Sequence, residues 1–112
     1  MVTFDQQLAA RIRALVANEA GLSERRMFGG LAFLIDGNMA VSASSGGGML
    51  LRVPPKQTGD LAEFPHAERF AMRGREMDGW LRVDLDGVRS DDALERWVAI
   101  GVAYARALPP KP

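Results

Sequence analysis

The chain has 112 residues, 47% of them hydrophobic and 25% charged, and its 14 basic and 14 acidic side chains leave no formal net charge. This balance is typical of one ordinary globular domain, and neutrality argues against a strong electrostatic grip on nucleic acid. The absence of cysteine excludes disulfides and thiolate metal sites and favours a cytoplasmic setting, and we expect neither a membrane span nor a signal peptide.

Residues 3–20 are predicted to form a helix. Thr3 is a suitable N-cap with Gln6 three positions later, as in a capping box, and Gly21 is a typical residue just past a helix end. Apolar side chains recur at helical spacing along one face until its last turn, which carries a glutamate. That face consists of Phe4, Leu8, Ile12, Leu15, Val16 and Glu19.

Residues 27–53 change to the alternation that is typical of strands. The Asp-Gly pair at 36–37 indicates a tight turn between two of them. The glycine-rich residues 44–48 predict a flexible connection. Residues 49–53 predict a third strand, which Pro54 ends because proline has no amide hydrogen to donate.

The stretch RRMFGGLAFLIDGNMA, residues 25–40, is predicted to be a strand interrupted by Gly29 and Gly30. A bulge or bend at the two glycines would re-aim such a strand over the core. The alternative is a ligand-binding loop in which Arg25 and Arg26 supply positive charge. We favour the bend, because a phosphate loop needs more glycines and a following helix whose N–H groups face the anion, whereas here a strand follows.

The second half of the chain predicts a further hairpin and a closing helix. Residues 56–67 allow one or two helical turns, and residues 69–73 and 79–85 are predicted to pair around a loop at 73–78. Ser90 is a suitable N-cap for the last helix, whose apolar face is so broad that we expect deep burial or partial cover by another subunit. The face consists of Leu94, Trp97, Val98, Gly101, Ala105 and Leu108, widened by Ile100, Val102 and Tyr104.

The order of helix, antiparallel strands and helix favours an α+β fold. We expect one domain over residues 1–112, with an antiparallel sheet of about four to six strands and the N-terminal and C-terminal helices packed on it. The motifs LLRV and WLRV predict two strands with one orientation rule, in which Arg52 and Arg82 face outward together. The opposite face then carries Leu51, Val53, Leu81 and Val83.

Four arginines and a tryptophan are the strongest candidates for a binding surface. Guanidinium groups on neighbouring strands can hold an acidic partner or a phosphate backbone. The alternative, which we favour, is a solvated sheet face on which acidic side chains pair with the arginines across strands. The candidates are Arg52, Arg73, Arg75, Trp80 and Arg82, and the acidic residues are Glu68, Glu76 and Asp84.

His66, the sole histidine, is expected to be a surface or capping residue. It lacks histidine or cysteine partners for a metal site of the usual kind and a serine on a strained elbow for a catalytic triad. The carboxylate pairs at 84/86 and 91/92 flank a turn and begin a helix, where acidic residues have ordinary structural roles. We therefore predict no catalytic residue, no metal site and no cofactor.

Four stretches of the chain resemble the N-terminal domain of the TfoX/Sxy family of competence regulators: RRMFGGLAFLIDGNMA, MLLRV, FAMRGREMDGWLRVD and LERWVAIGVAYARALP. The resemblance runs from about residue 4 to residue 108 and is closest to short stand-alone members that contain only this domain. It implies an α+β fold and no catalytic motif. Longer family members have a second, helical domain and act in regulating DNA-uptake genes alongside the cyclic-AMP receptor protein. The family signature falls on Met27, Phe28, Gly29 and Gly30.

We therefore predict a non-enzymatic regulatory or adaptor domain, in transcriptional regulation, that works by protein contact as a homodimer and with a protein partner not yet identified. The alternative is a weak nucleic-acid or anion-binding module, whose affinity should fall with salt. A third and least favoured hypothesis is an enzyme with a site around Arg25, Arg26 and His66. The predicted anion or partner surface consists of Arg25, Arg26, Arg52, Arg73, Arg75, Trp80 and Arg82.

Overall fold

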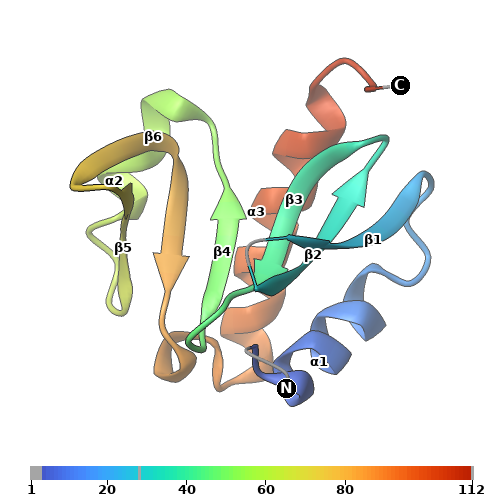
Figure 1. The fold of residues 1–112 in the computed structure, drawn as a ribbon, viewed down its shortest axis with the longest axis horizontal. Coiled ribbons are helices and arrows are strands. Elements are labelled where there is room, and N and C mark those ends of the chain that lie inside the picture. The colour runs from blue at the N-terminus through green and yellow to red at the C-terminus, as the bar shows by residue number, and fades with distance from the viewer. Residues whose placement is uncertain (1–3, 28, 112) are drawn as a thin grey trace.

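A six-stranded antiparallel sheet with helices packed against it forms the fold (Figure 1). The computed structural model describes residues 4–27 and 29–111. The strand order is β1-β2-β3-β4-β6-β5, so the α+β prediction with helices near both ends is confirmed. The strands are β1 (Leu22–Met27), β2 (Gly30–Ile35), β3 (Asn38–Ala43), β4 (Met49–Arg52), β5 (Ala67–Met72) and β6 (Arg75–Val83). The helices are α1 (Gln6–Val16), α2 (Thr58–Leu61) and α3 (Asp91–Ala107), with 3₁₀ turns η1 (Pro55–Gln57) and η2 (Leu85–Val88).

Helix α1 is shorter than the predicted helix at 3–20. Asp5 is its N-cap, because the Asp5 carboxylate accepts a hydrogen bond of 2.9 Å from the amide of Leu8. The Thr3 cap prediction lies outside the described residues. The helix ends at Val16, and Gly21, with a φ of 75°, instead turns the chain into β1.

Residues 25–40 form strands on both sides of the glycine pair, so the prediction of one bent strand is wrong. Met27 pairs with Gly30 across an antiparallel hairpin. Gly29 has a φ of 77°, which glycine adopts without a steric penalty. A Cβ on Gly30 would lie 2.5 Å from the carbonyl oxygen of Ala43 on β3. The glycines therefore allow a reversal and a close strand approach, and the strand at 49–53 is the fourth, not the third.

The two later turns follow the sequence more closely. The turn at 36–37 is confirmed, with positive φ at both residues, as a type I′ turn requires. The second hairpin is confirmed, but its turn is only Arg73-Gly74 and β6 already begins at Arg75. Strand β6 bends at Gly79, where φ is 90° and the amide donates to Thr58 Oγ1 at 2.8 Å. Beyond this bend the hairpin is exposed on both faces, so alternation gives no signal there.

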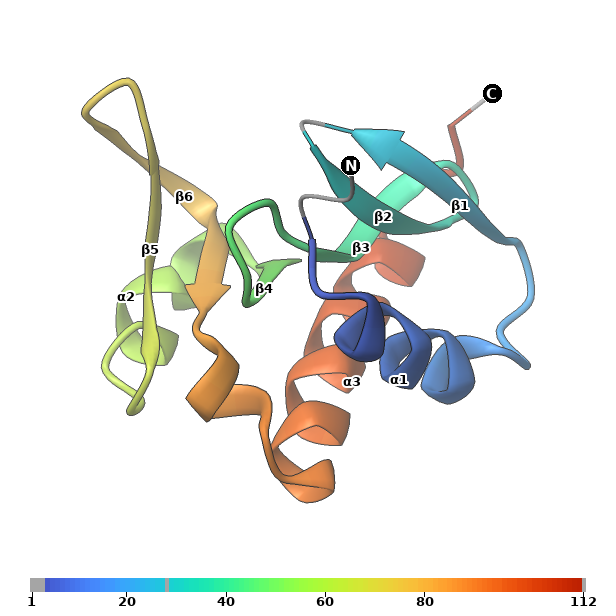
Figure 2. The same ribbon diagram turned by 60° about the horizontal axis from the view of Figure 1, so that its bottom comes forward.

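The core lies between the sheet and the two long helices, which Figure 2 shows side by side. The predicted buried face of α3 is confirmed for Leu94, Trp97, Val98, Gly101 and Ala105. The Ser90 hydroxyl caps this helix by accepting from the amide of Ala93. The predicted alternation of β4 and β6 is also confirmed. The residues predicted to face the core are fully buried, namely Leu51, Val53, Leu81 and Val83.

The C-terminal segment is attached to the β2–β3 hairpin. The amide of Lys111 donates to the Asp36 carbonyl at 2.7 Å, and the Asn38 side chain donates to the Pro109 carbonyl at 2.9 Å. Within residues 4–27 and 29–111, no helix is long and apolar enough to cross a membrane.

Candidate functional site

Helix α3 has a hollow on each of its two flanks. One lies between α3 and α1, and the other between α3 and the segment that leads from α2 into β5. They use different side chains of the same helix, because successive residues of a helix point about 100° apart. The two hollows are here called the helix groove and the aromatic hollow.

The helix groove has a mostly apolar lining that also includes Glu19 and Glu95, and a volume of about 330 Å³. Leu15 of α1 is 40% exposed at its edge, although apolar side chains of this size are usually covered. Glu95 lies at the groove and makes no ion pair within the described part of the chain. The lining residues are Leu15, Val16, Glu19, Glu95, Val98, Ala99, Val102 and Ala103.

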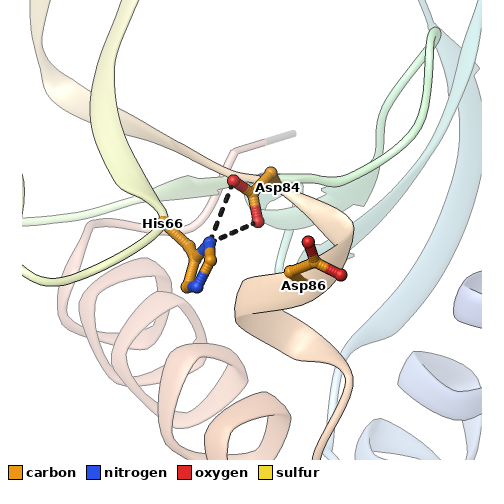
Figure 3. Close-up of side chains that lie close together, drawn as sticks. All are labelled: His66, Asp84 and Asp86. Atoms are coloured by element: carbon orange, nitrogen blue, oxygen red, sulfur yellow. Dashed lines mark hydrogen bonds and ion pairs between the residues drawn. The ribbon is translucent and has the colours of Figure 1, made fainter.

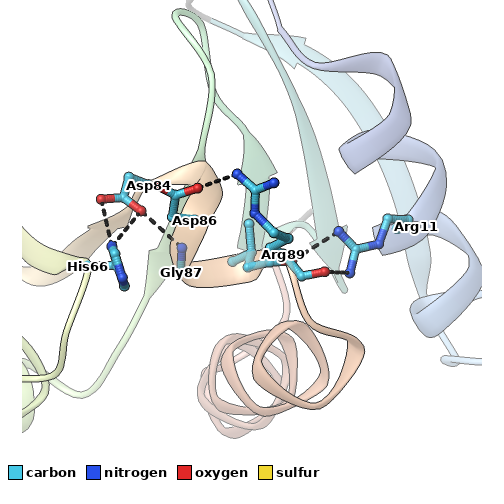
Figure 4. A network of polar contacts seen from close by, with 7 residues as sticks. Arg11, His66, Asp84, Asp86, Gly87 and Arg89 are labelled. Carbon is cyan, nitrogen blue, oxygen red and sulfur yellow. Dashed lines mark hydrogen bonds and ion pairs between the residues drawn. The ribbon is translucent and has the colours of Figure 1, made fainter.

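Arginine contacts fasten α1 to the neighbourhood of α3 at both ends of this groove. At one end Arg11 donates to the carbonyl oxygens of Val88 and Arg89 at 2.9 and 3.1 Å (Figure 4). At the other end Arg106 donates to the Glu19 carboxylate at 2.8 Å and to the carbonyl of Ala20 at 3.0 Å. The groove is therefore a fixed feature of the surface rather than a gap that α1 could close by tilting.

The aromatic hollow, of about 240 Å³, has Trp97 in its wall and Phe64 at its edge. The two rings meet edge to face with centroids 5.8 Å apart, a favourable geometry for aromatic pairs. Arg96 also lines this hollow and has no ion pair among the residues described. The lining residues are Phe64, Pro65, His66, Asp86, Gly87, Ala93, Arg96, Trp97 and Ile100.

His66, Asp84 and Asp86 meet beside the aromatic hollow (Figure 3). His66 Nδ1 lies 3.1 and 3.2 Å from the two carboxylate oxygens of Asp84. Asp84 also caps η2 by accepting from the Gly87 amide at 2.9 Å. Asp86 forms an ion pair with Arg89. One ligand atom from each of the three residues lies within 4.8 Å of the others, so these side chains could hold a metal ion together.

The pKa of the Asp84 carboxyl lies below its ordinary value. Desolvation is the largest single contribution and raises this pKa, but the hydrogen bonds from the Gly87 amide, the His66 ring and the Asp86 amide, with the attraction to His66, together lower it by more. Asp84 is therefore a carboxylate at neutral pH.

The structure brings together only some of the predicted surface arginines. Arg52 stacks on Trp80, 5.3 Å from the ring centroid, and reaches Tyr104 of α3 at 5.9 Å. Arg82 lies on the same sheet face and donates to the Gly47 carbonyl at 3.0 Å. Arg73 and Arg75 lie beyond the bend of β6, at the exposed tip of the hairpin.

The remaining predicted residues lie elsewhere. Arg25 and Arg26 are on β1, at the opposite edge of the sheet from β5, which His66 precedes. Neither hollow includes these two arginines, so the hypothesis of an enzyme site joining them to His66 is not supported. Of the family signature, Phe28 lies outside the described residues, Met27 ends β1, Gly29 lies in the β1–β2 turn and Gly30 begins β2.

Sequence reasoning missed the meeting of His66 with the two aspartates. The register of the second hairpin, in which Ala67 pairs with Val83, is the information that would have placed them together. The next residues outward on each strand are therefore neighbours, and the amide of Asp84 donates to the His66 carbonyl at 3.0 Å. The sequence predicted the hairpin without this register, and so left the three side chains apart.

Comparison with known proteins gives one match. The family model described as the TfoX N-terminal domain matches residues 14–105. This range covers most of the chain, from the second half of α1 to the last turns of α3. No curated protein and no solved structure matches the chain.

Proposed function

The chain belongs to the TfoX N-terminal domain family, and from this premise we propose that it is a non-enzymatic regulatory domain that acts in transcription through protein contact and forms a homodimer. The helix groove carries the proposal, because it is a mostly apolar hollow beside the long C-terminal helix. A second copy of the chain is its occupant. The cytoplasmic setting and a further protein partner belong to the same proposal.

Charge complementarity favours a second copy. Glu95 and Arg106 are eleven positions apart on α3, about three turns, and so project from the same side of the helix. Ala99 and Val102 lie between them on that side. If two copies of α3 pack antiparallel about a two-fold axis, Glu95 of each copy meets Arg106 of the other, as an isologous interface requires.

The small side chains of the groove suit close helix packing. Ala99 and Ala103 are exposed and leave room for the partner helix, while Leu15 of α1 provides apolar cover at its side. The eight lining residues of the groove provide less surface than the roughly 800 Å² that each partner buries in a standard interface. We therefore expect self-association in the micromolar range.

The alternative of nucleic-acid binding has less support. Arg52 and Arg82 are engaged within the chain, and the net charge is zero. A titration with single- and double-stranded DNA at low salt should therefore show no binding, whereas binding that weakens as salt rises would favour the alternative.

Two substitutions on α3 test the proposal. Ala99→Arg places a long charged side chain in the groove, and Ala107→Arg, also on an exposed part of α3 but outside the groove, is the matched control. Sedimentation equilibrium should show dimerisation weakened by roughly tenfold or more, about 1.4 kcal/mol, for the first variant alone.

The regulatory role needs a cellular readout. Transcript profiles of cells carrying Ala99→Arg should change in the same genes as a deletion of the gene, while the control variant matches the wild type. If the deletion changes no transcripts, the regulatory role is contradicted whatever the oligomeric state. If both variants dimerise like the wild type, the groove is not the interface.

A further inference from the structure

We propose that His66, Asp84 and Asp86 form a binding site for a zinc ion at the edge of the aromatic hollow. The ligand atoms already stand at suitable separations, since His66 Nδ1 is 3.1 Å from an Asp84 oxygen. A zinc ion about 2.1 Å from each ligand atom places neighbouring ligand atoms about 3–3.5 Å apart. The third ligand, an oxygen of Asp86, lies within 4.8 Å of the other two ligand atoms, so binding requires this carboxylate to rotate towards them and away from Arg89.

The backbone holds the segments that carry the ligands close together before any ion arrives. The Asp84 amide donates to the His66 carbonyl, which fixes the two segments to each other at 3.0 Å. Gly87 is buried against the imidazole side chain, and a Cβ at this position would lie 2.6 Å from His66 Cβ. Only glycine therefore lets His66 lie this close to η2, the turn that carries Asp86. This close approach of His66 to η2 explains why the cluster is compact.

The donor set selects the kind of ion. One imidazole nitrogen and two carboxylate oxygens suit zinc, whereas calcium and magnesium prefer oxygen ligands alone. Three protein ligands leave one position of a tetrahedral site open. His66 and Asp86 also line the aromatic hollow, so the zinc ion lies at its edge.

Arg89 is the internal competitor of the ion. Its guanidinium pairs with Asp86 (Figure 4), and zinc must displace this contact. Removing the guanidinium should therefore strengthen zinc binding. If zinc bound elsewhere on the surface, its affinity would not change when the guanidinium is removed. The contact of Arg89 with Arg11 uses the backbone carbonyl of Arg89, so Arg89→Gln leaves that contact available.

Isothermal titration calorimetry with zinc chloride tests the site, and it uses the full chain without an affinity tag. We expect one ion per chain, with binding weakened by roughly tenfold or more in His66→Gln and Asp86→Asn and strengthened in Arg89→Gln. Asp84→Asn should weaken zinc binding too, although the amide oxygen can still accept from Gly87. Glu76→Gln, an exposed carboxylate at the hairpin tip, is the control and should bind like the wild type.

The single histidine of the chain gives a second readout. Its imidazole resonances in a nuclear magnetic resonance spectrum should shift during the titration, and circular dichroism should show that His66→Gln remains folded. The proposal is overturned if zinc produces no heat and no shift at millimolar concentration, or if His66→Gln binds as well as the wild type. Because the site and the helix groove lie on different flanks of α3, either result leaves the proposed function to its own test.

Discussion

The two flanks of α3 show how one helix can present two kinds of surface. Towards α1 it faces another helix, and the helix groove is lined by small and apolar side chains with two glutamates, Glu19 and Glu95. Towards β5 it faces a turn and a loop, which bring backbone groups and polar side chains, and the aromatic hollow has a polar edge. Trp97 and Val98 are neighbours in sequence yet serve different hollows. The side chains of each hollow therefore depend on which element faces α3, namely α1 on one flank and the segment before β5 with η2 on the other.

Trp97→Ala should cause the largest loss of unfolding free energy, through the aromatic hollow. The side chain is only 6% exposed, and loss of a buried tryptophan typically costs about 3–5 kcal/mol of unfolding free energy. Denaturant titration measures this loss. Phe64→Ala, at a side chain that is 45% exposed, should cost far less, and equal losses would contradict the assignment of Trp97 to the core.

Gly101→Ala should disturb both flanks together. A Cβ at this position would lie 2.6 Å from the Ala40 carbonyl oxygen on β3, and α3 would have to move away from the sheet. We expect a net loss of about 1–3 kcal/mol, despite the gain in helix propensity of roughly 1 kcal/mol. A variant as stable as the wild type would show that α3 has freedom to shift on β3.

Arg11→Ala should loosen the helix groove alone. It removes the hydrogen bonds to the carbonyls of Val88 and Arg89, at a cost of about 1 kcal/mol. Amide hydrogen exchange should then rise in the first turn of α3 and in α1, with little change around Trp97. Equal protection in both proteins would contradict the fastening role of Arg11.

Acid should reduce the free energy of unfolding through protonation of Asp84, and Asp84→Asn should abolish this contribution. Because the folded-state pKa of Asp84 is depressed, its contribution to stability is present above the unfolded pKa and is lost as the pH falls through the folded pKa. The stability difference between wild type and variant should therefore shrink between about pH 5 and pH 2. Denaturation curves across this range measure it, and a difference that stays constant would contradict the shift.

Sequence patterns predicted the parts of the fold that are locally determined. The buried face of α3 and its Ser90 cap were correct because helical spacing and capping act within a few residues. Strand β1 was not predicted as a separate strand beginning at Leu22, because LSERRM lies at the edge of the sheet with its four central residues exposed, so its apolar residues do not alternate. The loop at 73–78 was too long for the same reason, since both faces of the hairpin tip are exposed.

The candidate sites were harder to predict because they depend on which segments meet. The helix groove requires the relative placement of α1 and α3, which Arg11 and Arg106 fasten from more than 75 positions away. The cluster at His66 depends on the register of one hairpin. Patterns of single residues carry neither kind of information. The family resemblance, given over about residues 4–108, is confirmed by the family match over residues 14–105.

A mixing experiment tests the self-association of α3 most directly. Glu95→Arg alone and Arg106→Glu alone should each place like charges at both ends of the paired helices and weaken dimerisation. Because Arg106→Glu also removes the contact of Arg106 with Glu19, thermal unfolding and the mixed sample separate loss of the interface from loss of the fold. Mixed in equal amounts, they should form a heterodimer with two opposite-charge pairs, detected by sedimentation equilibrium at micromolar concentration. If the mixture associates no better than either variant alone, or if the wild type is a monomer throughout this range, the antiparallel α3 interface is contradicted.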